Sequence, residues 1–156
     1  MSIKILTDSG SDYEKHEIDE KNIDVIPIPI TFKGRDYLSG VNLSKDDFFA
    51  LLEEGDDFPK TAQPSPQVFI DYFEEAKKNG DEVIAIMLSG SLSGMLQTMH
   101  LCKETVGYDK IHIIDSISAT VGMRLLVDNA VKLRDEGKSA DEIVSETESL
   151  KKRVRL

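Results

Sequence analysis

The segment Ser89-Gly-Ser-Leu-Ser-Gly94 places three hydroxyl groups and two glycines within six residues. An apolar run over residues 82–88 precedes it, and an amphipathic pattern that extends to about Val106 follows it. This arrangement predicts a turn between a buried strand and a helix. The free amide groups and the dipole at a helix start attract anions, and the serine hydroxyls add hydrogen-bond donors. The segment therefore favours recognition of a carboxylate or a phosphate.

A second hypothesis makes Ser91 or Ser93 the nucleophile of a small hydrolase or a phosphotransfer protein. A nucleophile of the G-x-S-x-G type needs serine where Leu92 stands, so that motif is not met. A serine nucleophile also needs a base. The histidines of the chain are His16, His100 and His112. His100 lies two turns into the helical pattern after Ser93, too far along to serve it easily. The residues therefore favour binding over catalysis.

Three more polar segments are candidates for the same site. Thr7–Asp12 and Asp115–Ser118 each follow a predicted strand, and Lys60–Pro66 leads into a predicted helix. The carboxyl ends of parallel strands meet at one edge of a sheet, and ligands of open α/β sheets bind there. The first two segments and the Ser89–Gly94 turn are therefore expected to gather at one edge, with Lys60–Pro66 lying over them.

Asp8 and Asp115 both stand at the ends of predicted strands. Two neighbouring carboxyl groups can divide the roles of acid and base, and a paired catalytic site is one interpretation. Aspartate side chains also accept hydrogen bonds from the amides of their own turns. This second interpretation, in which each aspartate braces a turn, is favoured.

The order of strands and helices predicts the fold class. Strands are expected over residues 3–6, 23–32, 82–88 and 111–114, with residues 37–38 pairing back as a hairpin. Helices are expected over residues 13–19, 44–54, 65–79, 93–106 and 119–136, and from Ser139 to the last residue. Pro27 and Pro29 lack amide donors, so their strand is expected at a sheet edge or partly irregular. The alternation predicts a three-layer, Rossmann-like α/β fold with a mainly parallel sheet and helices on both faces.

The composition bounds the function. The chain has 156 residues and a net charge of −10, which suits one domain and argues against binding nucleic acid or an anionic membrane. Its single cysteine excludes an internal disulfide. No apolar run approaches the roughly 18–20 residues that cross a bilayer, and the chain starts with a strand instead of a signal peptide. No metal-ligand spacing, Walker loop or G-x-G-x-x-G occurs, so no metal or cofactor is expected. The expected location is the cytoplasm.

Five short motifs follow one another along residues 1 to about 125. They are Thr7-Asp-Ser-Gly-Ser-Asp12, Val25-Ile-Pro-Ile28, Lys60-Thr-Ala-Gln-Pro-Ser65, Ser89-Gly-Ser-Leu-Ser-Gly-Met95, and Asp115-Ser116 with a looser Thr120-Val-Gly122. As a set they resemble the DegV family of bacterial fatty-acid-binding proteins. The chain departs from the family pattern at Ala62 and Gly90, where the family has Ser, and at Met95, where it has Thr. These departures remove two hydroxyls and add bulk beside the turn.

The resemblance implies a function and a set of ligand-binding residues. Family members bind one long-chain fatty acid and serve as the acyl-carrier subunit of a fatty acid kinase, without being enzymes themselves. A separate kinase subunit phosphorylates the bound carboxylate. The positions that would bind the carboxylate are Thr61 and Ser93, together with amide groups near Gly94 at the helix start. Two hydroxyls and these amides would satisfy a carboxylate that has lost its water.

The resemblance also implies that the family chain is about twice as long. Residues 1–156 are then expected to form a single α/β domain, without the C-terminal domain that supplies most of the acyl tunnel. A helical pattern that runs uncapped to an apolar Leu156 favours the same interpretation. Burial of each CH₂ group contributes about 0.8 kcal/mol, so residues 1–156 alone are expected to bind fatty acid weakly or not at all. A truncated unit that retains little binding, and self-associates through an exposed apolar surface, is therefore a third hypothesis.

Overall fold

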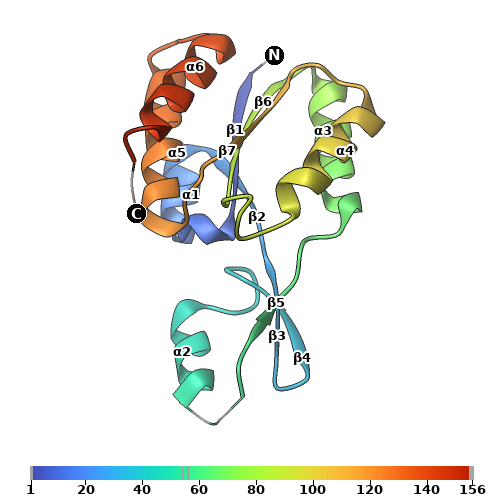
Figure 1. The fold of residues 1–156 in the computed structure, drawn as a ribbon, viewed down its shortest axis with the longest axis vertical. Coiled ribbons are helices and arrows are strands. Elements are labelled where there is room, and N and C mark those ends of the chain that lie inside the picture. The colour runs from blue at the N-terminus through green and yellow to red at the C-terminus, as the bar shows by residue number, and fades with distance from the viewer. Residues whose placement is uncertain (1, 54, 56, 155–156) are drawn as a thin grey trace.

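A four-stranded parallel sheet forms the centre of the protein, for which a computed structural model describes residues 2–53, 55 and 57–154. The strands are β1 (Ile3–Asp8), β2 (Ile23–Ile26), β6 (Glu82–Met87) and β7 (Ile111–Asp115). Their order is β2-β1-β6-β7, so the strands that carry polar segments at their ends, β1, β6 and β7, are neighbours. Figure 1 shows these strands running side by side between two layers of helices.

Helices cover both faces of this sheet. One layer contains α3 (Pro66–Asn79) and α4 (Met95–Val106), and the other contains α1 (Lys15–Lys21), α5 (Thr120–Asp135) and α6 (Ala140–Lys151). Alternate residues of β6 pack against the two helix layers. Val83, Ala85 and Met87 belong to the core under α3 and α4. Ile84 and Ile86 belong to the core under α5 and α6. A strand that is apolar at every position is typical of a parallel sheet buried on both faces. The predicted three-layer α/β fold is confirmed.

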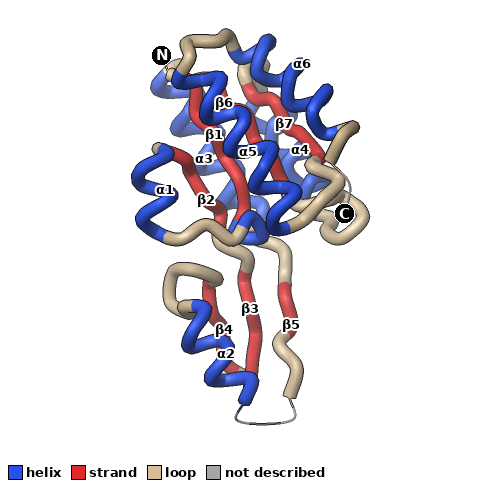
Figure 2. The backbone as a smooth tube through the Cα atoms, turned by 90° about the vertical axis from the view of Figure 1, so that its left-hand side faces the viewer, coloured by secondary structure: helices blue, strands red, loops and turns tan. Residues whose placement is uncertain are grey.

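A smaller lobe projects from this α/β body, beyond the carboxyl ends of the strands (Figure 2). Its antiparallel sheet has the order β4-β3-β5 and consists of β3 (Pro29–Phe32), β4 (Arg35–Leu38) and β5 (Lys60–Thr61). Helix α2 (Lys45–Glu53) lies between β4 and β5 in sequence. The predicted hairpin is confirmed, because β3 and β4 pair around Lys33 and Gly34, both of which have positive φ. The lobe was not foreseen as a separate unit.

The prediction of one strand over residues 23–32 is wrong. The chain leaves the body sheet after Ile26 and joins the lobe sheet at Pro29. Pro27 has no amide to donate, and the amide of Ile28 donates to the Ser9 hydroxyl at 3.0 Å instead of to a strand partner. The prediction of an edge strand holds for β2, which is the outermost strand of the body sheet.

Other differences concern the ends of elements. Strand β1 continues to Asp8, two residues beyond the prediction, and α1 starts at Lys15 instead of residue 13. Residues 60–61, predicted as loop, form β5. The last helix was predicted to reach the end of the chain, but it ends at Lys151. Residue 54 and the last two residues, which the predictions for the second and last helices included, lie outside the described residues.

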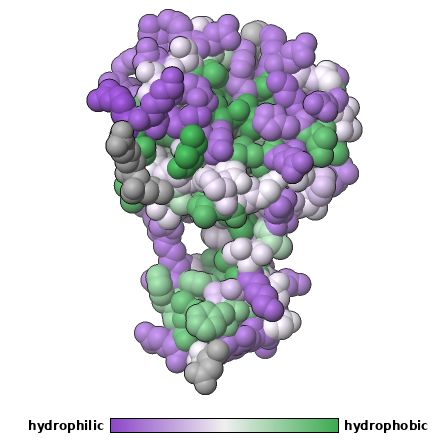
Figure 3. Space-filling view, viewed as in Figure 1, coloured by the Kyte–Doolittle hydropathy of each residue, from purple (hydrophilic) through white to green (hydrophobic). Residues whose placement is uncertain are grey.

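Apolar side chains remain exposed on the lobe (Figure 3). The exposed fractions of Phe49 and Phe58 are 61% and 81%, and those of Leu38 and Val41 are 38% and 68%. Within the described residues, no helix is both long enough and apolar enough to span a membrane.

Candidate functional site

The three polar segments at the ends of β1, β6 and β7 contact one another, as predicted. The amide of Leu88 donates to Asp8 Oδ2 at 2.7 Å, which ties the end of β6 to the end of β1. The amide of Ser89 donates to the carbonyl oxygen of Ser118 at 3.0 Å, and the amide of Gly90 donates to Asp115 Oδ1 at 3.2 Å. The Ser89–Gly94 turn is therefore held from both neighbouring strands.

The two aspartates accept hydrogen bonds from backbone amides on either side of this edge. Asp8 is fully buried and also accepts from the amide of Gly10 at 2.8 Å. Burial raises the pKa of the Asp8 carboxyl above its ordinary value, while the hydrogen bonds from Leu88 and Gly10 lower it. Asp115 accepts from the amide of Ile117 at 2.8 Å. These contacts support the favoured interpretation that both carboxylates brace turns.

Ser93 is positioned at the start of α4 by the turn that precedes it. The amides of Leu92 and Ser93 both donate to the carbonyl oxygen of Ser89, at 2.9 Å and 3.1 Å. The Ser93 hydroxyl accepts from the amide of Met95 at 3.2 Å, and Gly94 is the N-cap residue. Among the described residues, no group accepts the Ser93 hydroxyl proton. The half-buried hydroxyl can therefore donate to a ligand while it keeps its contact with Met95.

Thr61 lies in the lobe, on β5, where it is exposed and pairs with Ile30 of β3. The amide of Ala62 continues this pairing by donating to the carbonyl oxygen of Pro29 at 3.0 Å. The chain then returns to the body, and the Gln63 side chain reaches α4. Gln63 Oε1 accepts from the Thr98 hydroxyl at 3.2 Å. The fourth polar segment therefore lies over the predicted edge. It connects the lobe, which contains Thr61, to the body, which contains Ser93.

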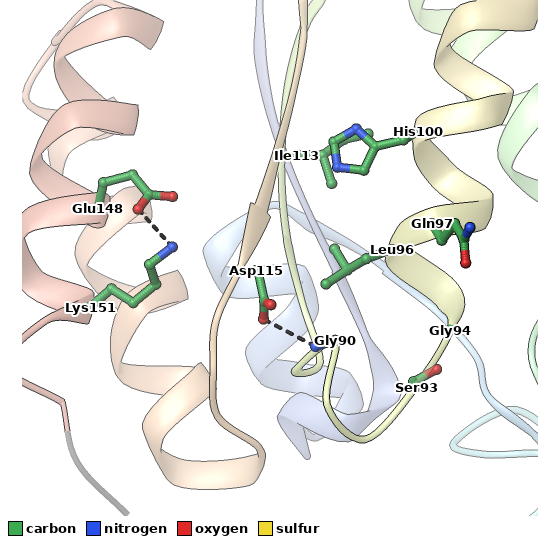
Figure 4. A pocket seen from close by; sticks show the side chains of 10 residues that line it. All are labelled: Gly90, Ser93, Gly94, Leu96, Gln97, His100, Ile113, Asp115, Glu148 and Lys151. Atoms are coloured by element: carbon green, nitrogen blue, oxygen red, sulfur yellow. Dashed lines mark hydrogen bonds and ion pairs between the residues drawn. The ribbon is translucent and has the colours of Figure 1, made fainter.

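A pocket of about 580 Å³ opens beside the turn, between α4 and α6 over β7 (Figure 4). Its lining combines Gly90, Ser93 and Gly94 of the turn region with Leu96, Gln97, His100, Ile113, Asp115, Glu148 and Lys151. The side chains of Glu148 and Lys151 form an ion pair at 2.6 Å. Sequence reasoning did not predict this pocket, because α6 has no spacing or motif that places it beside α4.

In the described part of the chain, the hydroxyls of Ser91 and Ser93 contact another serine and a backbone amide. The Ser91 hydroxyl shares a hydrogen bond of 3.0 Å with the Ser89 hydroxyl. Figure 4 shows His100 farther along α4 than Ser93, and His112 contacts Glu82 at 3.3 Å. Among the described residues, no histidine forms a hydrogen bond with Ser91 or Ser93, and no group of three or more His, Cys, Asp or Glu side chains could hold a metal ion.

The sequence relationships of the chain identify its family. A family model described as an uncharacterised protein of the DegV family matches residues 2–156. The chain belongs to the DegV family. A DegV domain-containing protein of Caldanaerobacter subterraneus subsp. tengcongensis is 39% identical over 153 residues, which cover 98% of this chain and 54% of the relative. One from Staphylococcus aureus is 36% identical over 152 residues, with coverages of 97% and 54%. The chain thus spans about half the length of these DegV relatives.

Solved DegV structures have the same fold. A DegV family protein from Thermus thermophilus, described by its fatty acid binding, superimposes with a TM-score of 0.87 at 30% identity, over 97% of this chain and 54% of its own. DegV from Bacillus subtilis, described as a fatty acid binding protein, gives a TM-score of 0.88 at 27% identity with the same coverages. A stearic acid-binding protein from Eubacterium ventriosum gives 0.85 at 27% identity, with coverages of 95% and 52%.

Proposed function

We propose that this chain binds the carboxylate of a long-chain fatty acid at the start of α4 and presents it to a separate fatty acid kinase subunit. The observation that carries the proposal is the Ser93 hydroxyl, which accepts from the Met95 amide and keeps its proton for a ligand. A carboxylate accepts hydrogen bonds and donates none. Its binding therefore requires donors such as this hydroxyl, the Thr61 hydroxyl and the first amides of α4.

The DegV structures described as fatty-acid-binding proteins support the identity of the ligand. The absence of a base beside Ser93 among the described residues supports a binder that leaves phosphoryl transfer to its partner. The pocket beside Ser93 is lined mostly by polar side chains. Residues 1–156 therefore supply the headgroup site in this proposal and little of the apolar surface that would bury an acyl chain.

The proposal is tested with Thr61→Ala and Ser93→Ala, singly and together, in the chain as its gene encodes it. A hydrogen bond to a charged group contributes about 1.5–3 kcal/mol, so each substitution should weaken fatty acid binding by about tenfold or more. Titration with a fluorescent fatty acid measures the affinity, and thermal unfolding checks the fold.

Ser91→Ala is the matched control, because it removes a hydroxyl of the same turn whose partner is Ser89. This variant should bind fatty acid as the unchanged protein does. Unchanged affinity in the Thr61→Ala, Ser93→Ala double variant would contradict the proposed site. Loss of folding in that variant would instead mark these residues as structural.

A further inference from the structure

The two hydroxyls of the proposed site belong to different parts of the molecule. Ser93 is part of the body, whereas Thr61 belongs to the lobe sheet through its pairing with Ile30. The chain crosses from body to lobe at residues 27–28 and returns through residues 62–65. Thr61 and Ser93 can serve one carboxylate only if the lobe keeps a fixed position against the start of α4, and the return segment is one of its connections to the body.

The Gln63 side chain makes the contact that holds the return segment. Its Oε1 accepts from the Thr98 hydroxyl on the first turn of α4 at 3.2 Å. On one side of Gln63, Ala62 is bonded to Pro29 of the lobe sheet at 3.0 Å. On the other side, Pro64 is buried and α3 begins two residues later. Gln63 therefore stands where the chain passes from one part of the molecule to the other.

The Gln63 side chain also lies directly over Gly94. A Cβ atom on Gly94 would lie 2.5 Å from Gln63 Nε2 and 3.5 Å from Gln63 Cδ. The φ angle of Gly94 is −73°, a value that any residue adopts, so the backbone does not require glycine here. The absence of a side chain at position 94 instead leaves the space that the Gln63 carboxamide occupies.

Thr61 lies two residues before Gln63 in the same segment. Residues two apart in an extended chain point to the same side, and the bond from Ala62 extends the pairing of β5 beyond Thr61. We propose that Gln63 is a positioning residue: by bonding Thr98 and packing on Gly94, it holds Thr61 close enough to Ser93 for both hydroxyls to donate to one carboxylate. This inference rests on the proposed function and names the residue that assembles its site.

The test is a double-mutant cycle between Gln63 and Thr61, with fatty acid affinity as the measurement. Gln63→Ala should weaken binding about fivefold, the size of effect that loss of one neutral hydrogen bond produces. Because Gln63 is exposed, the melting temperature should stay unchanged. If Gln63 acts by positioning Thr61, Gln63→Ala should have no effect in the Thr61→Ala background. A purely structural contact, or a direct contact of Gln63 with the ligand, would give the same loss in both backgrounds and overturn the proposal.

Thr98→Val and Gly94→Ala examine the same contact from α4. Thr98→Val removes the hydroxyl that Gln63 accepts from at nearly constant volume, and Gly94→Ala displaces the carboxamide. Thr98→Val should reproduce the fivefold loss and should add nothing to Gln63→Ala. If Thr61→Ala weakens binding and Gln63→Ala does not, the positioning role fails while the proposed function stands. If Thr61→Ala itself has no effect, the headgroup site fails, and the positioning role with it.

Discussion

At the scale of residues, most polar side chains at the candidate site form hydrogen bonds within the protein that hold the turns in place. Asp8 and Asp115 accept amides from two turns each, and Ser89 bonds both Ser91 and the backbone at Ser118. The Ser93 hydroxyl accepts from the amide of Met95 and retains a proton to donate. Ser89 and Ser91 share one hydrogen bond, so one of these two hydroxyls also retains a proton, and what distinguishes Ser93 is its position directly before the N-cap residue of α4.

Asp8 and Asp115 each accept hydrogen bonds from two backbone amides but differ in burial, so a comparison of the two shows how burial affects the stabilisation. Asp8→Ala should lower the free energy of unfolding by about 3 kcal/mol, because it leaves the part-buried amides of Gly10 and Leu88 without the acceptor that the buried Asp8 carboxylate provides. Asp115→Ala should cost about 1 kcal/mol or less, because water can reach the amides of Gly90 and Ile117, which are exposed. Urea unfolding of both variants measures the difference. Equal losses would show that burial is not what distinguishes the two carboxylates.

At the scale of elements, capping residues and prolines decide where helices and strands begin and end. Ser139 and Glu142 form a capping box at the start of α6: the Ser139 hydroxyl accepts from the Glu142 amide, and a Glu142 oxygen accepts from the Ser139 amide at 2.9 Å. Pro27 ends the body strand and releases the chain into the lobe. The capping box follows from residues that are neighbours in the sequence, whereas the end of the body strand also involves the contact between Ile28 and Ser9.

The capping box predicts a pH dependence. The Ser139 amide, followed by the Lys138 ammonium and the Ser139 hydroxyl, lowers the pKa of Glu142 from 4.5 to about 2. Because the pKa is lower in the folded state, the stabilisation is present above pH 4.5 and is lost as the pH falls from 4.5 toward 2. Glu142→Gln should therefore lower the melting temperature at pH 7, and this difference should vanish as the pH approaches 2.

The control for this prediction is Glu146→Gln, which removes a carboxylate from the same helix outside the capping box. Thermal unfolding of both variants is followed across the pH range at low ionic strength. A Glu142→Gln difference that stays constant from pH 7 to pH 2, or equals that of Glu146→Gln, would contradict the assignment.

At the scale of the whole molecule, the α/β body and the projecting lobe meet at the candidate site. Lys45 of α2 bonds Glu14 Oε1 at 2.6 Å and Asp12 Oδ1 at 3.1 Å, which adds a second connection between lobe and body beside that of Gln63. The lobe also carries exposed aromatic side chains, and the chain spans about half the length of its DegV relatives. An apolar surface of this kind favours association with another apolar surface.

Phe49 and Phe58 are therefore expected to promote self-association of residues 1–156. Phe49→Ser and Phe58→Ser should each shift the chain toward the monomer in sedimentation velocity experiments, because each removes an aromatic ring that is more than half exposed. Substitutions at such positions change the free energy of unfolding by about 0.5 kcal/mol or less, so the fold should persist. Leu125→Ser, an apolar residue of the body that is 51% exposed, is the control. An equal shift in the control would argue against the lobe as the contact.

The sequence alone determined the features that depend on neighbouring residues. The apolar runs and the helix periodicity predicted the parallel sheet, its layers and most helix positions, because each rests on the spacing of residues that are close in the sequence. The polar segments could be assigned to one sheet edge, since parallel strands bring their carboxyl ends together. The family motifs, which led to Thr61 and Ser93, are also local strings.

The tertiary structure decided how these pieces meet. That residues 23–32 divide between two sheets depends on the Ser9 hydroxyl, which accepts the Ile28 amide from 19 residues away in sequence. The role of Gln63 depends on Thr98 and on the space above Gly94, and no local pattern relates these positions. Whether Thr61 and Ser93 can bind the same carboxylate depends on the distance between the lobe and the body. Such distances arise from packing between segments far apart in the chain, which residue spacing does not specify.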